Sequence, residues 1–198
     1  MRFVMLVVLF FSSAVGAQEP ATFSVSVVPE RVRVGETATV WIDVTLSDDW
    51  HIYSATTPEG GPYPTEFVLI GKGFVQNGAV IQPPPIKEHD PNFDMMVEYY
   101  NKSVRFGMRV KVMDDAVVGA TTLSGEVTYM LCNATSCLPP NTYVYNVPVQ
   151  IELGQPRPEY VIAMASMVSK SEDSDLDGTG SIADVDRALS QGLGAFLY

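Results

Sequence analysis

The sequence is poor in cysteine, in basic residues and in long apolar runs, and each shortage narrows the choice of protein class. It has two cysteines in 198 residues, and its 46% hydrophobic content is enough to build a core without a disulfide or metal staple. Its 12 Lys and Arg are outnumbered by 23 Asp and Glu, and the net charge of −11 argues against nucleic acid and against anionic lipid as partners. The main apolar run, residues 3–11, is shorter than the roughly 20 residues that a membrane-spanning helix needs.

The first residues have the pattern of a secretory signal peptide. Arg2 supplies the positive start, residues 3–11 form the apolar region, and Val15-Gly16-Ala17 offers small residues for cleavage before Gln18. A retained membrane anchor is the weaker interpretation because the apolar run is short. We therefore expect residues 1–17 to be a signal peptide and the rest of the chain to be exported to a compartment where exposed thiols tend to pair.

Residues 18–155 have the pattern of a single β domain. Apolar and polar residues alternate in several short segments, which is the period of a half-buried strand. The expected strands lie near residues 23–27, 40–46, 50–53, 67–70, 104–112, 123–131 and 143–151. Residues 57–64 are rich in Gly and Pro and form a loop. Seven or eight short strands without a convincing helix predict an all-β, immunoglobulin-like β-sandwich.

The composition changes after Gly154, and residues 156–187 have the character of a linker. Residues 156–170 have the spacing of a short helix, whereas 171–181 are acidic and contain glycine. Four oxygen-bearing side chains in this linker match a calcium-loop spacing: Asp175, Asp177, Thr179 and Asp186. Asp186 stands at the last position of this calcium loop, where Glu is usual, and the sequence shows no pair of flanking helices. We favour an acidic linker and expect no metal or other cofactor.

The two cysteines lie close together in the sequence. Cys132 follows an expected strand, four residues separate it from Cys137, and a tight loop brings such a pair within reach of a disulfide. Closing so short a loop stabilises a fold by only about 2 kcal/mol in the chain-entropy model, which makes a poor staple. A working, reversible disulfide is therefore favoured over a structural clip. Residues 113–155 contain no Lys, Arg or His, so the neighbouring sequence supplies no cation to lower either thiol pKa.

Several segments carry a family resemblance. Residues 125–140, which contain both cysteines and Leu138-Pro139-Pro140, resemble the N-terminal periplasmic domain of the thiol:disulfide interchange protein DsbD. Residues 49–53 resemble the Tyr-rich strand of that family, and Phe93 with residues 98–102 resembles its cap loop and the following strand. The resemblance covers roughly residues 21–153. The cysteine spacing is one residue shorter than in the usual form, and Pro91-Asn92 replaces acidic residues.

The resemblance implies a protein-disulfide reductase activity and a role for each site residue. Cys137 would form the mixed disulfide with a partner, and Cys132 would resolve it. Phe93 would shield the pair between encounters, and Tyr53 and His51 would line the site.

The resemblance also implies partners and a location. Electrons would come from a membrane-embedded redox domain and pass to disulfide isomerases and thioredoxin-like proteins of the periplasm, including those of cytochrome c maturation. Residues 188–198 resemble the start of the family's first transmembrane helix, which would tether the domain to the inner membrane as part of a longer protein.

A different class of protein remains open at this stage. The chain is in that case a non-catalytic, immunoglobulin-like binding module of a cell-surface protein, in which the disulfide is a fixed clip. The redox potential separates the two hypotheses, because structural disulfides of secreted proteins usually lie below about −300 mV.

Overall fold

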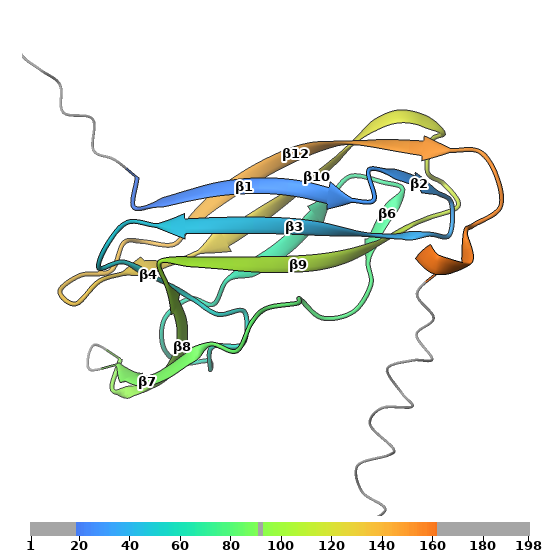
Figure 1. The fold of residues 1–198 in the computed structure, drawn as a ribbon. Coiled ribbons are helices and arrows are strands. Elements are labelled where there is room, and N and C mark those ends of the chain that lie inside the picture. Colours follow the sequence, from blue (N-terminus) through green and yellow to red (C-terminus); the bar gives the residue numbers. More distant parts are fainter. Residues whose placement is uncertain (1–18, 91–92, 162–198) are drawn as a thin grey trace, which may run out of the picture. The chain divides into compact units, whose positions relative to one another are not determined.

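The structure is a computed structural model that describes residues 19–90 and 93–161 (Figure 1). In these residues the chain forms β1 (Ala21–Val28), β2 (Arg31–Arg33), β3 (Thr37–Leu46), β4 (His51–Tyr53), β5 (Glu66–Ile70), β6 (Phe74–Gln76), β7 (Ile86–Asp90), β8 (Met95–Asn101), β9 (Ser103–Val112), β10 (Gly119–Tyr129), β11 (Leu131–Cys132), β12 (Asn141–Glu152) and one 3-10 turn, η1 (Pro158–Tyr160). No helix in these two ranges has the length and apolar character needed to cross a membrane.

The strands form three sheets, two of which pack face to face as a β-sandwich. The first has the order β1-β3-β9-β6 and the second β2-β12-β10-β5, and β2 pairs with β12 in parallel. Alternate residues of β3, including Val40 and Ile42, are buried against apolar residues of β9 such as Phe106. Leu123 and Val127 of β10 belong to the same buried cluster. The prediction of an all-β, immunoglobulin-like sandwich is confirmed.

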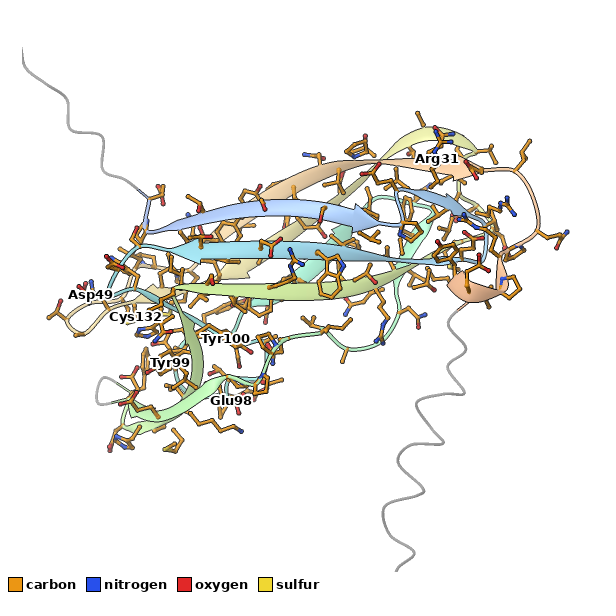
Figure 2. All side chains as sticks on the ribbon, in the orientation of Figure 1. Arg31, Asp49, Glu98, Tyr99, Tyr100 and Cys132 are labelled. Atoms are coloured by element: carbon orange, nitrogen blue, oxygen red, sulfur yellow. A yellow bond between two sulfur atoms is a disulfide. The ribbon has the colours of Figure 1, made fainter. Side chains whose placement is uncertain are left out.

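The third sheet, of order β11-β4-β8-β7, lies at one end of the sandwich (Figure 1). The chain enters it from β3 through Asp49, at φ 67°, and leaves it for β9 through Lys102, at φ 62°. Both residues adopt the left-handed backbone conformation that allows a sharp change of direction. Figure 2 shows Cys132 and Tyr99 at this end of the molecule and Arg31 at the other.

The two faces of the third sheet have different surroundings. One face carries Ile52, Tyr100 and Leu131, which join the core of the sandwich. The other face carries Tyr53 and Cys132, which belong to a separate small cluster. Because side chains alternate along a strand, the short strands β4 and β11 hold Tyr53 and Cys132 on the face away from the main core.

The expected strands are all present, but the alternation pattern missed β2, β6, β7 and β8, of which β8 was expected only from the family resemblance. The first two have three residues each, and β7, with the sequence Ile-Lys-Glu-His-Asp, is exposed except at Asp90. An edge strand with so little buried surface has no apolar alternation to detect. The signal peptide at 1–17, the calcium-loop residues Asp175, Asp177, Thr179 and Asp186, the segment 188–198 and most of the linker lie outside the described residues.

Candidate functional site

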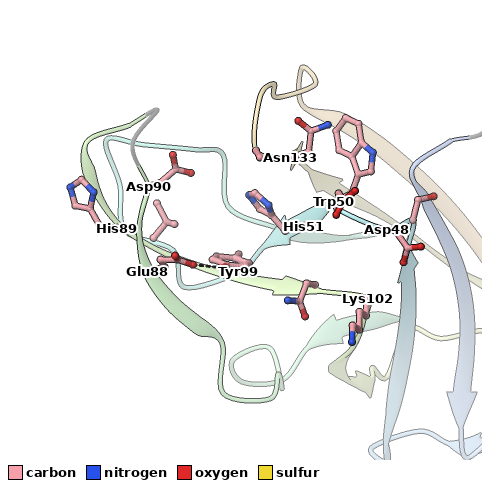
Figure 3. A pocket seen from close by; sticks show the side chains of 14 residues that line it. Asp48, Trp50, His51, Glu88, His89, Asp90, Tyr99, Lys102 and Asn133 are labelled. Carbon is pink, nitrogen blue, oxygen red and sulfur yellow. Dashed lines mark hydrogen bonds between the residues drawn. The ribbon is translucent and has the colours of Figure 1, made fainter.

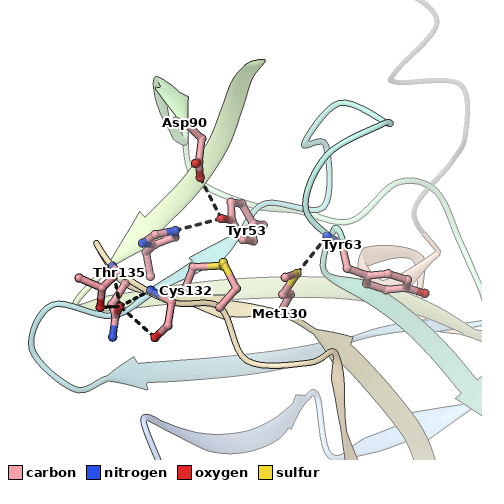
Figure 4. Close-up of a disulfide and its surroundings, with 10 residues drawn as sticks. Tyr53, Tyr63, Asp90, Met130, Cys132 and Thr135 are labelled. Carbon is pink, nitrogen blue, oxygen red and sulfur yellow. Dashed lines mark hydrogen bonds between the residues drawn. A yellow bond between two sulfur atoms is a disulfide. The ribbon is translucent and has the colours of Figure 1, made fainter. Parts of the chain in front are cut away.

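Cys132 and Cys137 form a disulfide that closes a four-residue loop between β11 and β12 (Figure 4). Their Cα atoms are 4.0 Å apart, and the two residues face each other as an antiparallel bridge. The backbone N–H of Leu138 donates to the carbonyl of Leu131 over 2.8 Å, and that of Asn133 donates to Ser136 over 2.9 Å. The disulfide thus sits at the end of a very short β ladder.

The loop between the cysteines is organised by the side chain of Asn133. Its Oδ1 accepts hydrogen bonds from the backbone N–H groups of Thr135 and Ser136, at 3.0 and 2.9 Å. It also accepts from the two hydroxyl groups, at 3.1 and 3.3 Å. An Asn side chain that satisfies successive backbone donors is a usual device for fixing a tight turn. Thr135 and Ser136 are otherwise exposed.

The two sulfur-bearing residues differ in burial. Cys132 is 0% exposed, whereas Cys137 is only partly buried. Around them packs an apolar cluster formed by Tyr53, Val97, Phe93, Met95, Tyr99 and Met130. The ring of Phe93 meets that of Tyr53 edge to face, with centroids 6.4 Å apart. An attacking group can therefore approach Cys137 more easily than Cys132.

A chain of hydrogen bonds runs from β4 to β7 beside the disulfide. The Tyr53 hydroxyl donates to Asp90 Oδ2 over 3.2 Å, and His51 Nε2 lies 3.2 Å from the same hydroxyl (Figure 4). Burial, reinforced by the Asp90 charge, raises the pKa of Tyr53 above its usual value, so the phenol keeps its proton. Burial lowers the pKa of His51 below its ordinary value of 6.5, although Asp90 and Glu88 oppose this shift.

Tyr99 of β8 covers the other side of the imidazole. Its ring centroid lies 4.7 Å from that of His51, and its hydroxyl donates to Glu88 Oε2 over 2.5 Å. This hydrogen bond, together with burial, raises the pKa of Tyr99 to about 12. His51 is thus held between two tyrosines whose hydroxyl groups both point to carboxylates of β7.

A pocket of about 800 Å³ opens on this side of the third sheet (Figure 3). Asn133 and Ala134 of the cysteine loop form one wall, and Glu88 and Asp90 of β7 belong to the opposite one. His51 lies between them (Figure 3). A second, smaller groove of about 460 Å³ lies along the loop 59–66 and includes Phe93 and Met130.

The structure brings four of the five sequence-predicted residues into one cluster, namely Cys132, Cys137, Phe93 and Tyr53. The fifth, His51, joins through its contact with Tyr53. Sequence reasoning missed Asp90, Glu88, Tyr99 and the turn-forming role of Asn133. In the sequence, Asp90 and Glu88 stand in a polar stretch without periodicity, and only knowledge of the strand register brings them to the site.

The described part of the chain contains no group of three or more His, Cys, Asp or Glu side chains placed to hold a metal ion. A search of curated protein sequences finds no match. The family model described as "Thiol:disulfide interchange protein DsbD, N-terminal" matches residues 17–148. The chain belongs to this family. It is a thiol:disulfide exchange domain of the DsbD N-terminal type.

Solved structures similar to this DsbD-type domain include a DsbD domain, a ScsB domain and a pilin subunit. The reduced N-terminal domain of Neisseria meningitidis DsbD is 14% identical, with a TM-score of 0.38, over 60% of this chain and 82% of that one. The N-terminal periplasmic domain of Proteus mirabilis ScsB is 20% identical, with a TM-score of 0.46, over 76% of this chain and 55% of that one. The pilin subunit BcpA of Bacillus cereus is 9% identical, with a TM-score of 0.38, over 68% of this chain and 40% of that one.

Proposed function

We propose that this domain carries electrons from a membrane-embedded redox domain to oxidised proteins of the periplasm, through a reversible Cys132–Cys137 disulfide. Family membership supports the thiol:disulfide chemistry. The observation that carries the assignment of roles is the unequal burial of the two cysteines, since Cys132 is 0% exposed and Cys137 is partly exposed. Exchange needs an accessible attacking sulfur and a second sulfur held close behind it.

The reaction follows from this arrangement in two steps. In the reduced domain the Cys137 thiolate attacks a partner disulfide, the partner S–S bond breaks, and a Cys137–partner disulfide forms. The Cys132 thiolate then attacks Cys137 Sγ, and the partner leaves as a dithiol once both of its sulfurs are protonated. Two electrons pass to the partner, and the domain returns to the oxidised form. Phe93 acts as a cover that shields the pair between encounters.

The partners we propose are thioredoxin-like proteins and disulfide isomerases on the accepting side, and a membrane-embedded redox domain, which belongs to the same polypeptide, on the donating side. We also propose that the domain is periplasmic and tethered to the inner membrane. The ScsB domain from Proteus mirabilis is itself described as periplasmic. Because this chain spans only 55% of that structure, the activity of the whole protein is part of the proposal.

The trapping of a mixed disulfide tests the roles of the cysteines. Cys132→Ala leaves the accessible sulfur without its resolving partner, so incubation with an oxidised thioredoxin-like protein should accumulate a mixed disulfide on a non-reducing gel. Cys137→Ala leaves only the fully buried sulfur and should trap little. Equal trapping by the two variants contradicts the assignment.

A second candidate is the non-catalytic binding module in which the disulfide is a structural clip, and the full burial of Cys132 is the observation that favours it. Equilibration of the whole chain with glutathione buffers separates the two functions. A working pair should have a potential above about −300 mV, whereas a value below that limit supports the clip.

A further inference from the structure

The strand register places His51 directly beside the buried cysteine. His51 of β4 is the Cα partner of Cys132 of β11 on one side and of Asn101 of β8 on the other. Residues that pair directly across two antiparallel strands project to the same face, with Cβ atoms about 4.5–5.5 Å apart. His51 is the only histidine on β4 or β11, and its imidazole and the Cys132 sulfur therefore share one face of the third sheet.

The hydrogen-bond chain fixes which imidazole nitrogen carries the proton. The Tyr53 hydroxyl has a single hydrogen, which it donates to Asp90 Oδ2. The same oxygen can then only accept from His51, so Nε2 must carry the hydrogen. In a neutral imidazole the other nitrogen, Nδ1, is then an acceptor. No hydrogen bond to Nδ1 is found among the residues that the structure describes.

We propose that His51 accepts the proton of the Cys132 thiol through Nδ1, and that Tyr53 and Asp90 hold the imidazole in the tautomer that this transfer requires. The inference rests on the proposed function and deepens it, because it names the group that activates the resolving sulfur. Residues 113–155 contain no Lys, Arg or His that could activate the thiol. The proposed base comes instead from another strand, β4.

The proton passes from the cysteine to the histidine and then to the leaving thiolate. The Cys132 S–H bond breaks and its proton goes to Nδ1, which makes His51 an imidazolium. The resulting thiolate attacks Cys137 Sγ, so the Cys132–Cys137 bond forms and the Cys137–partner bond breaks. The departing partner thiolate then takes the proton from the imidazolium, directly or through water. His51 ends the step neutral and is not consumed.

The groups that face His51 are suited to an imidazole that is neutral before the proton transfer and becomes charged only during it. Burial lowers its pKa below 6.5, so the imidazole is unprotonated near neutral pH. The carboxylates of Asp90 and Glu88 on β7 oppose that shift and stabilise the imidazolium once it forms. The ring of Tyr99 of β8 packs against the imidazole in a tilted arrangement, and the same pocket includes His89 and Lys102 together with Asp48 and Asp49.

A two-step reaction with a chromogenic aromatic disulfide isolates the proposed transfer. The reduced chain of 198 residues releases one coloured thiolate when Cys137 attacks and a second when Cys132 resolves the adduct, so stopped-flow absorbance separates the two rates. In the wild type the second rate should level off once His51 is neutral. In His51→Gln it should fall about 100-fold at pH 7, the lower end of the range for general bases, and rise tenfold per pH unit until the thiol itself ionises.

Two further variants distinguish a proton acceptor from a merely structural residue. Tyr53→Phe keeps the ring but removes the hydroxyl that orients His51, so it should slow the second step in the same pH-dependent way and by less. His89→Gln changes the other histidine, on β7, whose side chain is 56% exposed, and it should leave both steps unchanged.

The outcomes are distinct. If the wild type shows both steps and the second rate of His51→Gln has the same pH profile as that of the wild type, His51 is not the proton acceptor. The exchange function then stands. If the wild type shows no second step, Cys132 does not resolve the adduct, and both the proposed function and this inference fail.

Discussion

At the scale of single residues, we propose that Phe93 controls approach to the cysteines. It is half-buried against Tyr53 and the disulfide, and it also lines the groove of about 460 Å³ beside Met130. Phe93→Ala should therefore speed the reaction of the reduced pair with a bulky thiol reagent by about tenfold, because the apolar cover is lost. Reaction rates followed by mass spectrometry measure this effect.

The matched control for that prediction is Phe93→Leu, which keeps an apolar side chain of similar reach. It should react with the bulky reagent nearly as slowly as the wild type does. With a small thiol reagent, the reaction rates of the wild type, Phe93→Ala and Phe93→Leu should differ less. A rate for Phe93→Ala equal to that of the wild type means that the phenylalanine does not cover the pair.

Residues of the site differ in how far the sequence alone could reveal them. The cysteines are visible from their spacing and rarity, whereas His51, Tyr53 and Phe93 come only from the family resemblance. Asp90 could not be predicted, because its role depends on the pairing of β7 with β8, and β7 has no apolar periodicity. The sequence therefore predicts the reacting cysteines better than it predicts the surrounding polar groups, such as Asp90.

At the scale of elements, the loop 133–136 holds the cysteines close enough to pair. Asn133→Ala removes an acceptor that four donors share, so the loop becomes more mobile and the two sulfurs of the reduced form meet less often. We expect the equilibrium with glutathione to shift about tenfold toward the dithiol, which corresponds to a potential about 30 mV less negative.

Thr135→Ala is the matched control for the loop, because it removes one hydroxyl and leaves both backbone donors to Asn133 in place. Its potential should change by much less than that of Asn133→Ala. Equal shifts in the two variants would show that the Asn side chain does not organise the loop.

The same scale explains why the sandwich was easier to predict than the third sheet. Long strands such as β3 and β9 bury every second residue in the core, so the pattern of Val40, Ile42 and Phe106 is strong. β4 and β11 have only three and two residues, so the sequence predicts extended segments there but no alternation that assigns them to a separate sheet. β4 begins just after the left-handed residue Asp49 and β8 ends just before the left-handed residue Lys102, and the sequence does not mark either change of direction.

At the scale of the whole molecule, the cysteine pair and the 3-10 turn η1 lie at opposite ends of the long strands. β12 begins after the cysteine loop and runs for 12 residues, about 40 Å, before the chain reaches η1. There, Arg157 donates to both carboxylate oxygens of Glu36, at 2.9 and 2.6 Å, and Glu36 is 0% exposed. The backbone N–H of Arg33 donates to the same carboxylate over 3.0 Å.

This ion pair predicts how stability depends on pH. The hydrogen bonds from Arg157 hold the pKa of Glu36 at about 2, below its ordinary value of 4.5. A carboxylate with a lowered pKa contributes its full stabilisation above the unfolded value and loses it as the pH falls from about 4.5 toward 2. The fold should therefore be most sensitive to acid within that interval.

Arg157→Met tests the pair and its distance from the redox site together. It leaves the buried Glu36 carboxylate without its partner, so the melting temperature at pH 7 should fall by about 10 °C, and the difference from the wild type should narrow as the pH drops below about 4.5. Arg31→Met is the control, because the ion pair of Arg31 with Glu152 is exposed and such pairs contribute little. The glutathione equilibrium of both variants should match the wild type, since the cysteine loop lies at the far end of β12. A shift in that equilibrium for Arg157→Met would mean that the two ends of the sandwich are coupled.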